Sequence, residues 1–248
     1  MHTLAPSESR SVPPIPQLLP AAGTLPELRL ATVDNDGALG QPLSEHESIW
    51  QQLVRRELTL RSTFAHGERF YVLLQYTDLA NGEGLTLRKR NVFERVVLGD
   101  TGRVTGQVLG LANSTVASYT LNSLRKLKLR SRERAVPLAL ALHLSRHALT
   151  DHDARASSFL TPEGRFKVLS LRNPSTSRFA LLTAAERGVA SLVMLGNSNS
   201  EIAINRNTSL HTVENQVVSI FRKFDASNRF QLMSRLLGVC STSTTCPQ

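Results

Sequence analysis

The strongest constraint on this chain is a duplication, because one arrangement of residues occurs twice at a separation of 97 positions. The segment LTLRKRNVFERVVLG at 85–99 aligns with LTAAERGVASLVMLG at 182–196 without a gap. The same separation aligns Thr115-Val116 with Thr212-Val213, Arg125-Lys126 with Arg222-Lys223, and Arg132 with Arg229. A repeat of this length indicates that the chain builds one structural unit twice.

A β-rich pair of segments precedes each copy of the repeat. STFAHGERFYVLL resembles SSFLTPEGRFKVLS, which aligns Phe64 with Phe159 and Phe70 with Phe166 at separations of 95 and 96. Small insertions in loops would explain why these separations fall short of 97. Segments rich in aromatic and β-branched residues on both sides of a turn are typical of a β-hairpin. We therefore expect one hairpin before each copy.

These segments predict a protein that is mainly α with small β-hairpins, of the α+β class. A short helix is expected around Ile49, Trp50 and Leu53, which fall on one helical face. The stretch AVPLALALHL alternates with period two, but its Ala-Leu composition favours a helix. The predicted organisation is a Pro-rich disordered segment at 1–44, a helix-plus-hairpin module at 45–84, a helical domain at 85–142 (copy one), a second helix-plus-hairpin module at 143–181, a helical domain at 182–238 (copy two) and a flexible tail at 239–248.

The charge of the chain is positive and unevenly distributed. The net charge is +9, yet residues 1–84 hold 6 basic and 10 acidic side chains, whereas residues 85–134 hold 11 basic and 3 acidic ones. A basic balance favours polyanions, either nucleic acid or an anionic surface. The electrostatic attraction for a polyanion is therefore expected to be strongest in copy one.

Several function classes find no support in the sequence. Cys240 and Cys246 lie in a polar tail and form neither a disulfide framework nor a metal site, and the seven histidines show no metal spacing. No serine or cysteine accompanies a His-Asp pair in a recognisable signature, so neither catalysis nor a cofactor is expected. The longest mostly apolar run, residues 136–142, is too short to cross a bilayer, and no secretory signal is evident. We expect a soluble intracellular protein.

Copy two contains a helix that is apolar on one side and polar on the other. Ser209 is a suitable N-cap for this helix, because its hydroxyl can accept a free backbone N–H. The opposite face carries small polar groups near its N-terminus, which suits the major groove of DNA. The predicted buried stripe consists of Val213, Val217, Ile220, Phe221 and Phe224.

Shorter helices are expected on both sides of this one. Residues 199–205 supply a short helix, and the polar connection 206–208 makes the pair a helix-turn-helix. Residues 183–195 predict a helix that opens with a capping box, in which Thr183 and Glu186 each satisfy a free N–H. A fourth amphipathic helix is expected at 228–237.

These motifs together carry a family resemblance. Copy two contains L-T-x-x-E-R, L-G-x-x-N, E-I-A, S-x-x-T-V, R-K and R in order over residues 182–238, and it resembles the LuxR/GerE-type helix-turn-helix of bacterial transcription regulators. The resemblance implies four helices, the third in the major groove of DNA and the fourth often making a dimer contact. It therefore specifies the fold class as two tandem four-helix LuxR-type domains, each preceded by its helix-plus-hairpin module.

The resemblance also implies which residues would contact DNA. In copy two the base-contacting positions would be Glu214, Asn215 and Val218, and the phosphate-contacting positions Ser200, Thr212, Arg222 and Lys223. In copy one the base-contacting positions would be Ala117, Ser118 and Leu121, and the phosphate-contacting positions Arg103, Thr115, Arg125 and Lys126.

Both copies depart from the family pattern. Glu214 stands where the family usually has Lys, which would lower general affinity for phosphates while allowing a contact to cytosine N4. Copy one lacks the capping box, since Lys89 occupies the position of Glu186, and Gly106 is expected to weaken its second helix by roughly 1 kcal/mol. Copy one is thus expected to grip the DNA backbone, and copy two to discriminate between sequences.

The sequence favours a sequence-specific bacterial transcription regulator of double-stranded DNA, located in the cytoplasm on the nucleoid. RNA polymerase is a further candidate partner, and two copies in one chain suggest an internal pseudo-dimer as an alternative to a homodimer. Two other functions stay open. The chain could be a degenerate helix-turn-helix module that binds a protein partner. Alternatively, it could be an architectural protein that binds DNA non-specifically through its basic segment.

Overall fold

A computed structural model of the chain describes residues 25–39, 41–42, 49–77, 84–147, 154–172 and 176–237. Its helices are α1 (Leu25–Leu39), α2 (Ile49–Val54), α3 (Leu87–Val97), α4 (Gly102–Leu109), α5 (Asn113–Lys126), the short 3-10 helix η2 (Glu133–Ala135), α6 (Val136–His147), α7 (Thr176–Phe179), α8 (Ala184–Met194), α9 (Asn199–Asn205), α10 (Leu210–Lys223) and α11 (Arg229–Leu237). Its strands are β1 (Gln41–Pro42), β2 (Leu58–His66), β3 (Arg69–Tyr76), β4 (Ala154–Thr161) and β5 (Gly164–Arg172).

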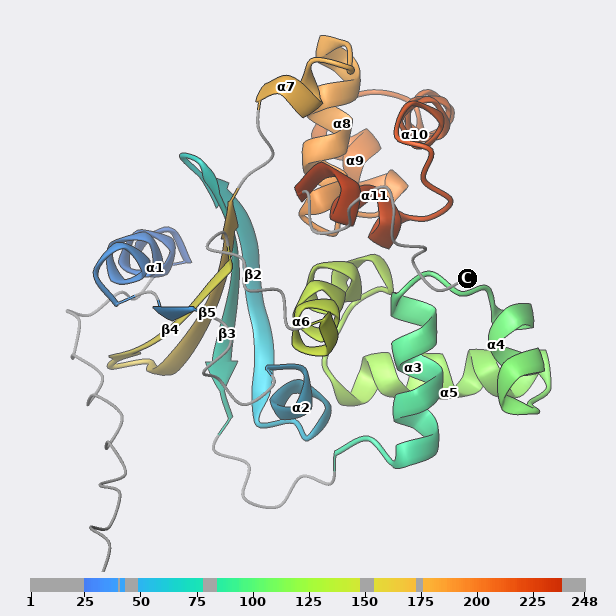
Figure 1. Ribbon diagram of the computed structural model, residues 1–248, viewed down its shortest axis with the longest axis horizontal. Helices are drawn as coiled ribbons and strands as arrows, with labels where there is room; N and C mark the ends of the chain where they lie inside the picture. Colours follow the sequence, from blue (N-terminus) through green and yellow to red (C-terminus); the bar gives the residue numbers. More distant parts are fainter. Residues whose placement is uncertain are drawn as a thin grey trace, which may run out of the picture.

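The two hairpins belong to a single antiparallel sheet with the strand order β1-β4-β5-β3-β2. This corrects the expectation of two separate hairpin modules. The hairpins β2–β3 and β4–β5 join through β3 and β5, which pair from Arg69 opposite Arg172 to Gln75 opposite Phe166. A two-stranded hairpin is at best marginally stable alone, and joining the two gives each an extended partner. In Figure 1 the sheet stands between α1 and the other helices.

The register of β3 and β5 relates the two hairpins by an approximate two-fold axis. Leu73 lies opposite Val168, and these two residues are counterparts in the duplicated hairpin, 95 positions apart. Because a residue faces its own counterpart, exchanging the two hairpins leaves the pairing unchanged. This is the arrangement of an isologous dimer contact, formed here within one chain.

The aromatic residues of the hairpins correct one detail of the sequence alignment. Phe64 stacks on Tyr71 with ring centroids 5.0 Å apart, and Phe159 stacks on Phe166 at 5.4 Å. Tyr71 is therefore the counterpart of Phe166, also at a separation of 95. The proposed match of Phe70 with Phe166 is wrong, because Phe70 packs in a different cluster on the other face of the sheet. Neighbouring side chains of a strand point to opposite faces, so an error of one residue inverts the assignment.

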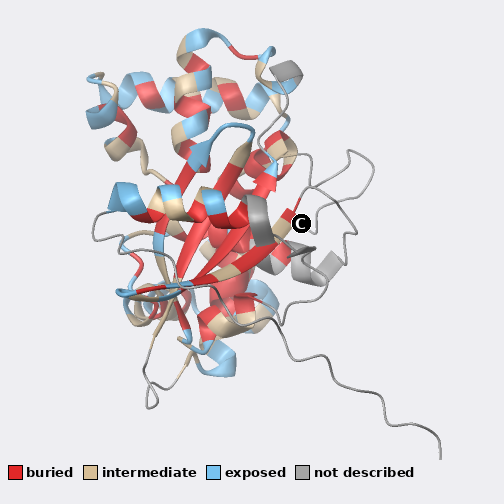
Figure 2. Cartoon of the chain, turned by 90° about the vertical axis from the view of Figure 1, so that its left-hand side faces the viewer, coloured by how far each residue is buried: buried red, intermediate tan, exposed pale blue. Residues whose placement is uncertain are grey.

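Helix α1 covers one face of the sheet. It contributes the buried Leu28 to the aromatic cluster, and its Asp36 accepts a hydrogen bond from Ser170 Oγ at 2.7 Å and pairs with Arg69 at 3.2 Å. Figure 2 shows its outer side exposed and the strands behind it buried. The prediction of disorder for residues 1–44 is wrong for α1 and β1, while residues 1–24 lie outside the described part. No apolar periodicity indicated α1, because much of its contact with the sheet is polar.

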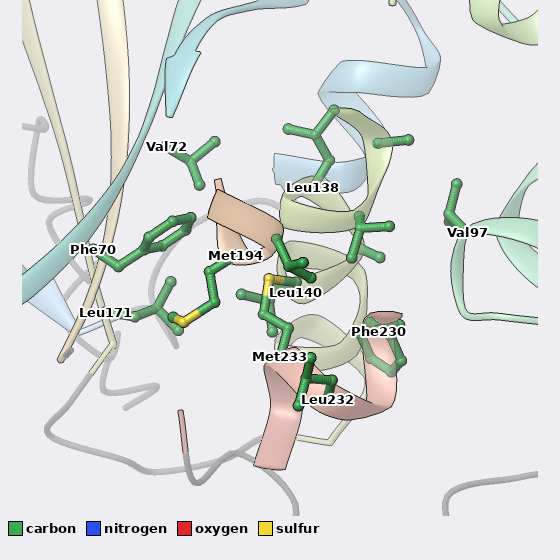
Figure 3. Packing of buried hydrophobic residues seen from close by; sticks show 14 of the residues in the cluster. Phe70, Val72, Val97, Leu138, Leu140, Leu171, Met194, Phe230, Leu232 and Met233 are labelled. Carbon is green, nitrogen blue, oxygen red and sulfur yellow. The ribbon is translucent and has the colours of Figure 1, made fainter. Parts of the chain in front are cut away.

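The opposite face of the sheet is covered by helices from both copies. One core cluster runs from the sheet through α2 and α6 into the two helical domains. Figure 3 shows side chains of β3 and β5 near those of α3, α6, α8 and α11: Phe70, Val72, Leu171, Met194, Leu138, Leu140, Met233 and Val97. The helical domains and the hairpins therefore share a core.

The two helical copies have matching backbones. Residues with positive φ recur at a separation of 97 in three places, at Gly99 (108°) and Gly196 (77°), Gly110 (62°) and Asn207 (50°), and Lys128 (55°) and Asp225 (47°). The helix predicted for AVPLALALHL is confirmed as α6, which with η2 forms the fourth helix of copy one. Helix α6 continues to His147, so it also leads into the second hairpin, and it packs against α2 and α11.

Candidate nucleic-acid interface

Helix α10 has the two-sided character expected of a helix that contacts DNA. Val213, Val217 and Ile220 are buried, and Ser209 caps the helix by accepting a hydrogen bond from Thr212 N at 3.0 Å. The candidate base-contacting residues Glu214, Asn215 and Val218 are exposed, and so are the candidate phosphate-contacting residues Ser200, Thr212 and Arg222. Phe221 and Phe224 are only partly buried at the edge of the core.

Two capping boxes hold the helices in front of α10. The predicted one is present, with Glu186 N donating to Thr183 Oγ1 at 3.3 Å and Thr183 N donating to Glu186 Oε2 at 2.8 Å. A second one opens α9, where Ser198 and Glu201 exchange the same two hydrogen bonds at 3.2 and 2.7 Å. Sequence reasoning missed this box, although the spacing S-x-x-E marks it.

Glu186 also joins α8 to α10. Its carboxylate accepts hydrogen bonds from Ser219 Oγ at 2.7 Å and Lys223 Nζ at 2.6 Å. The contact with Lys223 and those with Thr183 and Ser219 lower the pKa of Glu186 from 4.5 to about 2. The family pattern makes Lys223 a candidate phosphate contact. Its ammonium is instead held by Glu186, which leaves Arg222 as the more available cation at this end of α10.

In copy one, helix α5 presents a different surface. Its candidate base-contacting residues Ala117, Ser118 and Leu121 are exposed, as are Arg103 and Arg125, while Thr115 is partly buried. Helix α5 has no side-chain cap, because Ala112 stands at the position of Ser209. Lys126 cannot pair as Lys223 does, since Lys89 replaces Glu186, and its Nζ donates to the Gly84 carbonyl at 3.3 Å.

A contact with α2 anchors copy one. Trp50 Nε1 donates a hydrogen bond to Glu94 Oε1 at 2.7 Å, and Arg90 Nε donates to the same oxygen at 2.8 Å. The ring of Trp50 stacks on Phe93 with centroids 6.0 Å apart. These contacts attach α3, the first helix of copy one, to the segment before the first hairpin.

The core of copy one contains polar substitutions. Thr105 and Ser123 are completely buried, and their hydroxyls make no hydrogen bond with the described residues. Their counterparts in copy two are Ile202 and Ile220, also completely buried. A buried hydroxyl without a partner costs about 1–3 kcal/mol. Copy one is therefore less well stabilised between its second and third helices.

Gly106 allows α4 to approach α5 closely. A Cβ at this position would lie 2.6 Å from the Leu111 carbonyl oxygen, a distance that is sterically forbidden. The sequence suggested only that this glycine weakens the helix. The structure adds that the glycine makes room for the turn between α4 and α5.

The two copies touch each other through reciprocal contacts. A Cβ on Gly99 of copy one would collide with the Asn228 side chain of copy two, and a Cβ on Gly196 of copy two would lie 2.9 Å from the Glu133 carbonyl oxygen of copy one. Arg134 of copy one pairs with Glu201 of copy two at 3.1 Å. Helices α6 and α11, the fourth helices of the two copies, also pack together.

The described residues hold no group of three or more His, Cys, Asp or Glu side chains that could bind a metal ion. None of the helices in the described ranges combines the length and apolar character needed to cross a membrane.

Comparison with known proteins bears on the repeated helical domain. A family model described as bacterial regulatory proteins, luxR family, matches this chain twice, at residues 83–139 and 180–236. The chain carries two LuxR-type helix-turn-helix domains in tandem. The match supports a DNA-binding helix-turn-helix regulator in general terms. No curated protein and no solved structure matches the chain.

The LuxR-type matches span α3 to the start of α6 and α8 to α11. They include all fourteen candidate contact residues, and the structure gathers these on the second and third helices of each domain. Most are exposed; the exceptions are Thr115 and Lys126, which are partly buried. The sheet that joins the LuxR-type domains lies outside both matches.

Proposed function

We propose that this chain is a transcription regulator of the LuxR type that binds double-stranded DNA with α10 and α5 in the major groove. The observation that carries the proposal is the surface of α10, where Glu214, Asn215 and Val218 are exposed opposite a buried apolar stripe. An exposed polar helix face at the end of a helix-turn-helix is what major-groove recognition requires.

The two copies would play unlike parts on DNA. In copy two, the Asn215 amide can recognise adenine, Glu214 can accept from cytosine N4, and Val218 can contact a thymine methyl. Phosphates would be held by Ser200, Thr212 and Arg222, with a smaller share from Lys223. In copy one, Ala117, Ser118 and Leu121 offer little hydrogen bonding, whereas Arg103, Thr115, Arg125 and Lys126 suit the backbone.

The contact between the copies favours a single chain as the binding unit. The paired hairpins and the packing of α6 on α11 resemble an internal dimer contact, which supports the pseudo-dimer over a homodimer. In Figure 1, however, α10 is seen end-on and α5 from the side. Their different directions favour unlike roles over a symmetric pair. Such a regulator would act on the nucleoid in the cytoplasm, where RNA polymerase is a candidate partner.

Selection of bound sequences from a random duplex library tests the proposal. We expect an enriched motif. N215A should reduce the free-energy discrimination between bases at one position of that motif by about 1–3 kcal/mol, while S118A should leave the motif almost unchanged. R222Q and R125Q should each reduce affinity for all DNA sequences. Each should also reduce by about one the slope of the logarithm of the binding constant against the logarithm of the salt concentration. R61Q, an exposed arginine on β2, serves as the matched control. Binding without any enriched motif would favour the architectural alternative.

A protein-interaction module is the second candidate, and the polar core of copy one favours it. Thr105 and Ser123 lack partners in the described structure, and α3 and α5 lack side-chain caps. A domain no longer selected for DNA binding could accumulate such changes. Failure to bind any duplex at low salt would support this alternative and reject the leading one.

A further inference from the structure

A cleft lies where the two LuxR-type domains meet. Its cavity volume is about 330 Å³, within the range of small-molecule sites. Copy one lines it from the end of α3 and the loop after it, from η2 with the residue before it, and from the start of α6. Copy two lines it from α9, α10 and α11 and the residues just before α11. The residues that matter for its chemistry are Arg132, Glu133, Val136, Phe221, Arg229 and Phe230.

The two equivalent arginines of the repeat, Arg132 and Arg229, both line this cleft. Arg229 has a structural task, because its guanidinium donates to the Asn197 carbonyl and to Asn199 Oδ1, both at 2.5 Å. Burial lowers the pKa of Arg229, the nearby charge of Glu133 raises it, and that of Arg132 lowers it. Arg229 therefore orders the segment before α9 and has few donors left for a ligand.

Arg132 and Glu133 are differently placed. Neither side chain forms a hydrogen bond or ion pair with the described part of the chain, although Glu133 is half-buried. The other carboxylate of the cleft, Asp100, is already paired with Arg95 at 2.8 Å. The cleft thus holds one cation and one anion that form no hydrogen bond or ion pair with the described residues, beside an apolar wall that includes Val136 and Phe230. Glu133 also lies near enough to Arg229 for its charge to act on that guanidinium, which leaves its carboxylate available for a further contact.

We propose that this cleft binds a small zwitterion with an apolar body, of which an apolar α-amino acid is the simplest example. The ligand carboxylate would pair with Arg132, its ammonium group with Glu133, and its side chain would lie against Val136, Phe221 and Phe230. Glu133 is half-buried, so an ion pair with it is stronger than one at an open surface, whereas Arg132 is exposed at the mouth of the cleft. A ligand with a single charge would leave one of the two protein charges unpaired, so the zwitterion should bind best.

Ligand binding at this site would affect the contact between the two domains, because each domain supplies part of the wall of the cleft. A bound ligand would add contacts across this boundary and stabilise the present placement of α11 against α6. The binding event itself requires no DNA, so it can be tested apart from the proposed regulatory function.

Isothermal titration calorimetry of the full chain provides the test. The probes are L-leucine, L-phenylalanine, 3-phenylpropionate, which lacks the ammonium group, and 2-phenylethylamine, which lacks the carboxylate. We expect saturable one-to-one binding of at least one amino acid, and binding at least about tenfold weaker for both single-charge analogues.

Three variants assign the charges. R132Q should weaken amino-acid binding about tenfold, and E133Q should do the same while improving the binding of 3-phenylpropionate. R130Q is the matched control, since Arg130 is exposed on the same segment and does not line the cleft. Thermal melts of each variant check that the fold is kept.

The proposal is overturned if neither amino acid binds saturably, or if R132Q and E133Q bind like R130Q. Equal binding of the amino acid and its single-charge analogues would also overturn it. If the full chain binds an amino acid but does not bind DNA, the result counts against the proposed regulatory function alone.

Discussion

Leu73 in β3 lies directly opposite Val168 in β5, and each residue is the counterpart of the other in the duplicated hairpin. Both are completely buried. A duplicated segment that pairs with its own copy behaves as a dimer contact whose two halves are covalently linked. The linkage raises the effective concentration of the two hairpins, so the contact forms without a second chain.

The first half of the chain should therefore dimerise when it is separated from the second. A polypeptide of residues 25–147 keeps β2 and β3 but exposes the edge of β3 that β5 covers. We expect it to form a homodimer by antiparallel pairing of β3 about Leu73, with light scattering reporting twice the chain mass. L73K should abolish this dimer, because it buries two like charges opposite each other. A folded monomer of residues 25–147 would contradict the expectation.

Glu186 should make the stability of copy two depend on pH. Its pKa falls from 4.5 to about 2 on folding, so it stabilises the fold above pH 4.5 and this contribution is lost as the pH falls towards 2. Because Lys223 is partly exposed, we expect E186Q to reduce the free energy of unfolding by about 1–3 kcal/mol at pH 7. Urea denaturation at several pH values should show the two proteins converging near pH 2.

E214Q is the control for that experiment, since Glu214 is exposed on α10. It should follow the wild-type pH dependence. A constant difference between wild type and E186Q from pH 7 to pH 2 would show that Glu186 acts through packing and not through its charge.

Copy one should become more stable when its buried hydroxyls are removed. T105V and S123A replace groups that have no hydrogen-bond partner among the described residues by apolar groups of similar size. We expect each to raise the free energy of unfolding by about 1 kcal/mol, measured by urea denaturation. T120V is the matched control, because Thr120 Oγ1 donates to the Val116 carbonyl at 2.8 Å, and it should be neutral or destabilising. Destabilisation by both T105V and S123A would indicate that ordered water satisfies the hydroxyls.

Gly196 should tolerate substitution less well than Gly110. Both have positive φ, 77° and 62°, so alanine costs about 1–2 kcal/mol of backbone strain at either position. Gly110 faces open space, whereas a Cβ on Gly196 would press on the Glu133 carbonyl and the Pro137 ring of copy one. Thermal melts should therefore show G196A destabilised by about 1–3 kcal/mol more than G110A. Equal destabilisation by G196A and G110A would mean that the residues of copy one around Gly196 can move to accommodate a Cβ atom.

Local structure in the helical domains followed from the residues themselves. The stripe of Val213, Val217 and Ile220, the capping box of Thr183 and Glu186, and the N-cap Ser209 were predicted and are present. Such features depend on contacts within three or four residues, which the sequence displays directly. The repeat at a separation of 97 residues likewise predicted that the two domains have the same backbone conformation.

Tertiary structure alone decided how these units combine. The pairing of β3 with β5, the position of α1 on the sheet, and the capture of Lys223 by Glu186 each join residues far apart in the chain. No local pattern reports such contacts, because hydrogen bonding at a strand edge and ion pairing depend on where the rest of the fold places a partner. For the same reason, the repeat predicted two hairpins, and only packing determined that they form a single sheet.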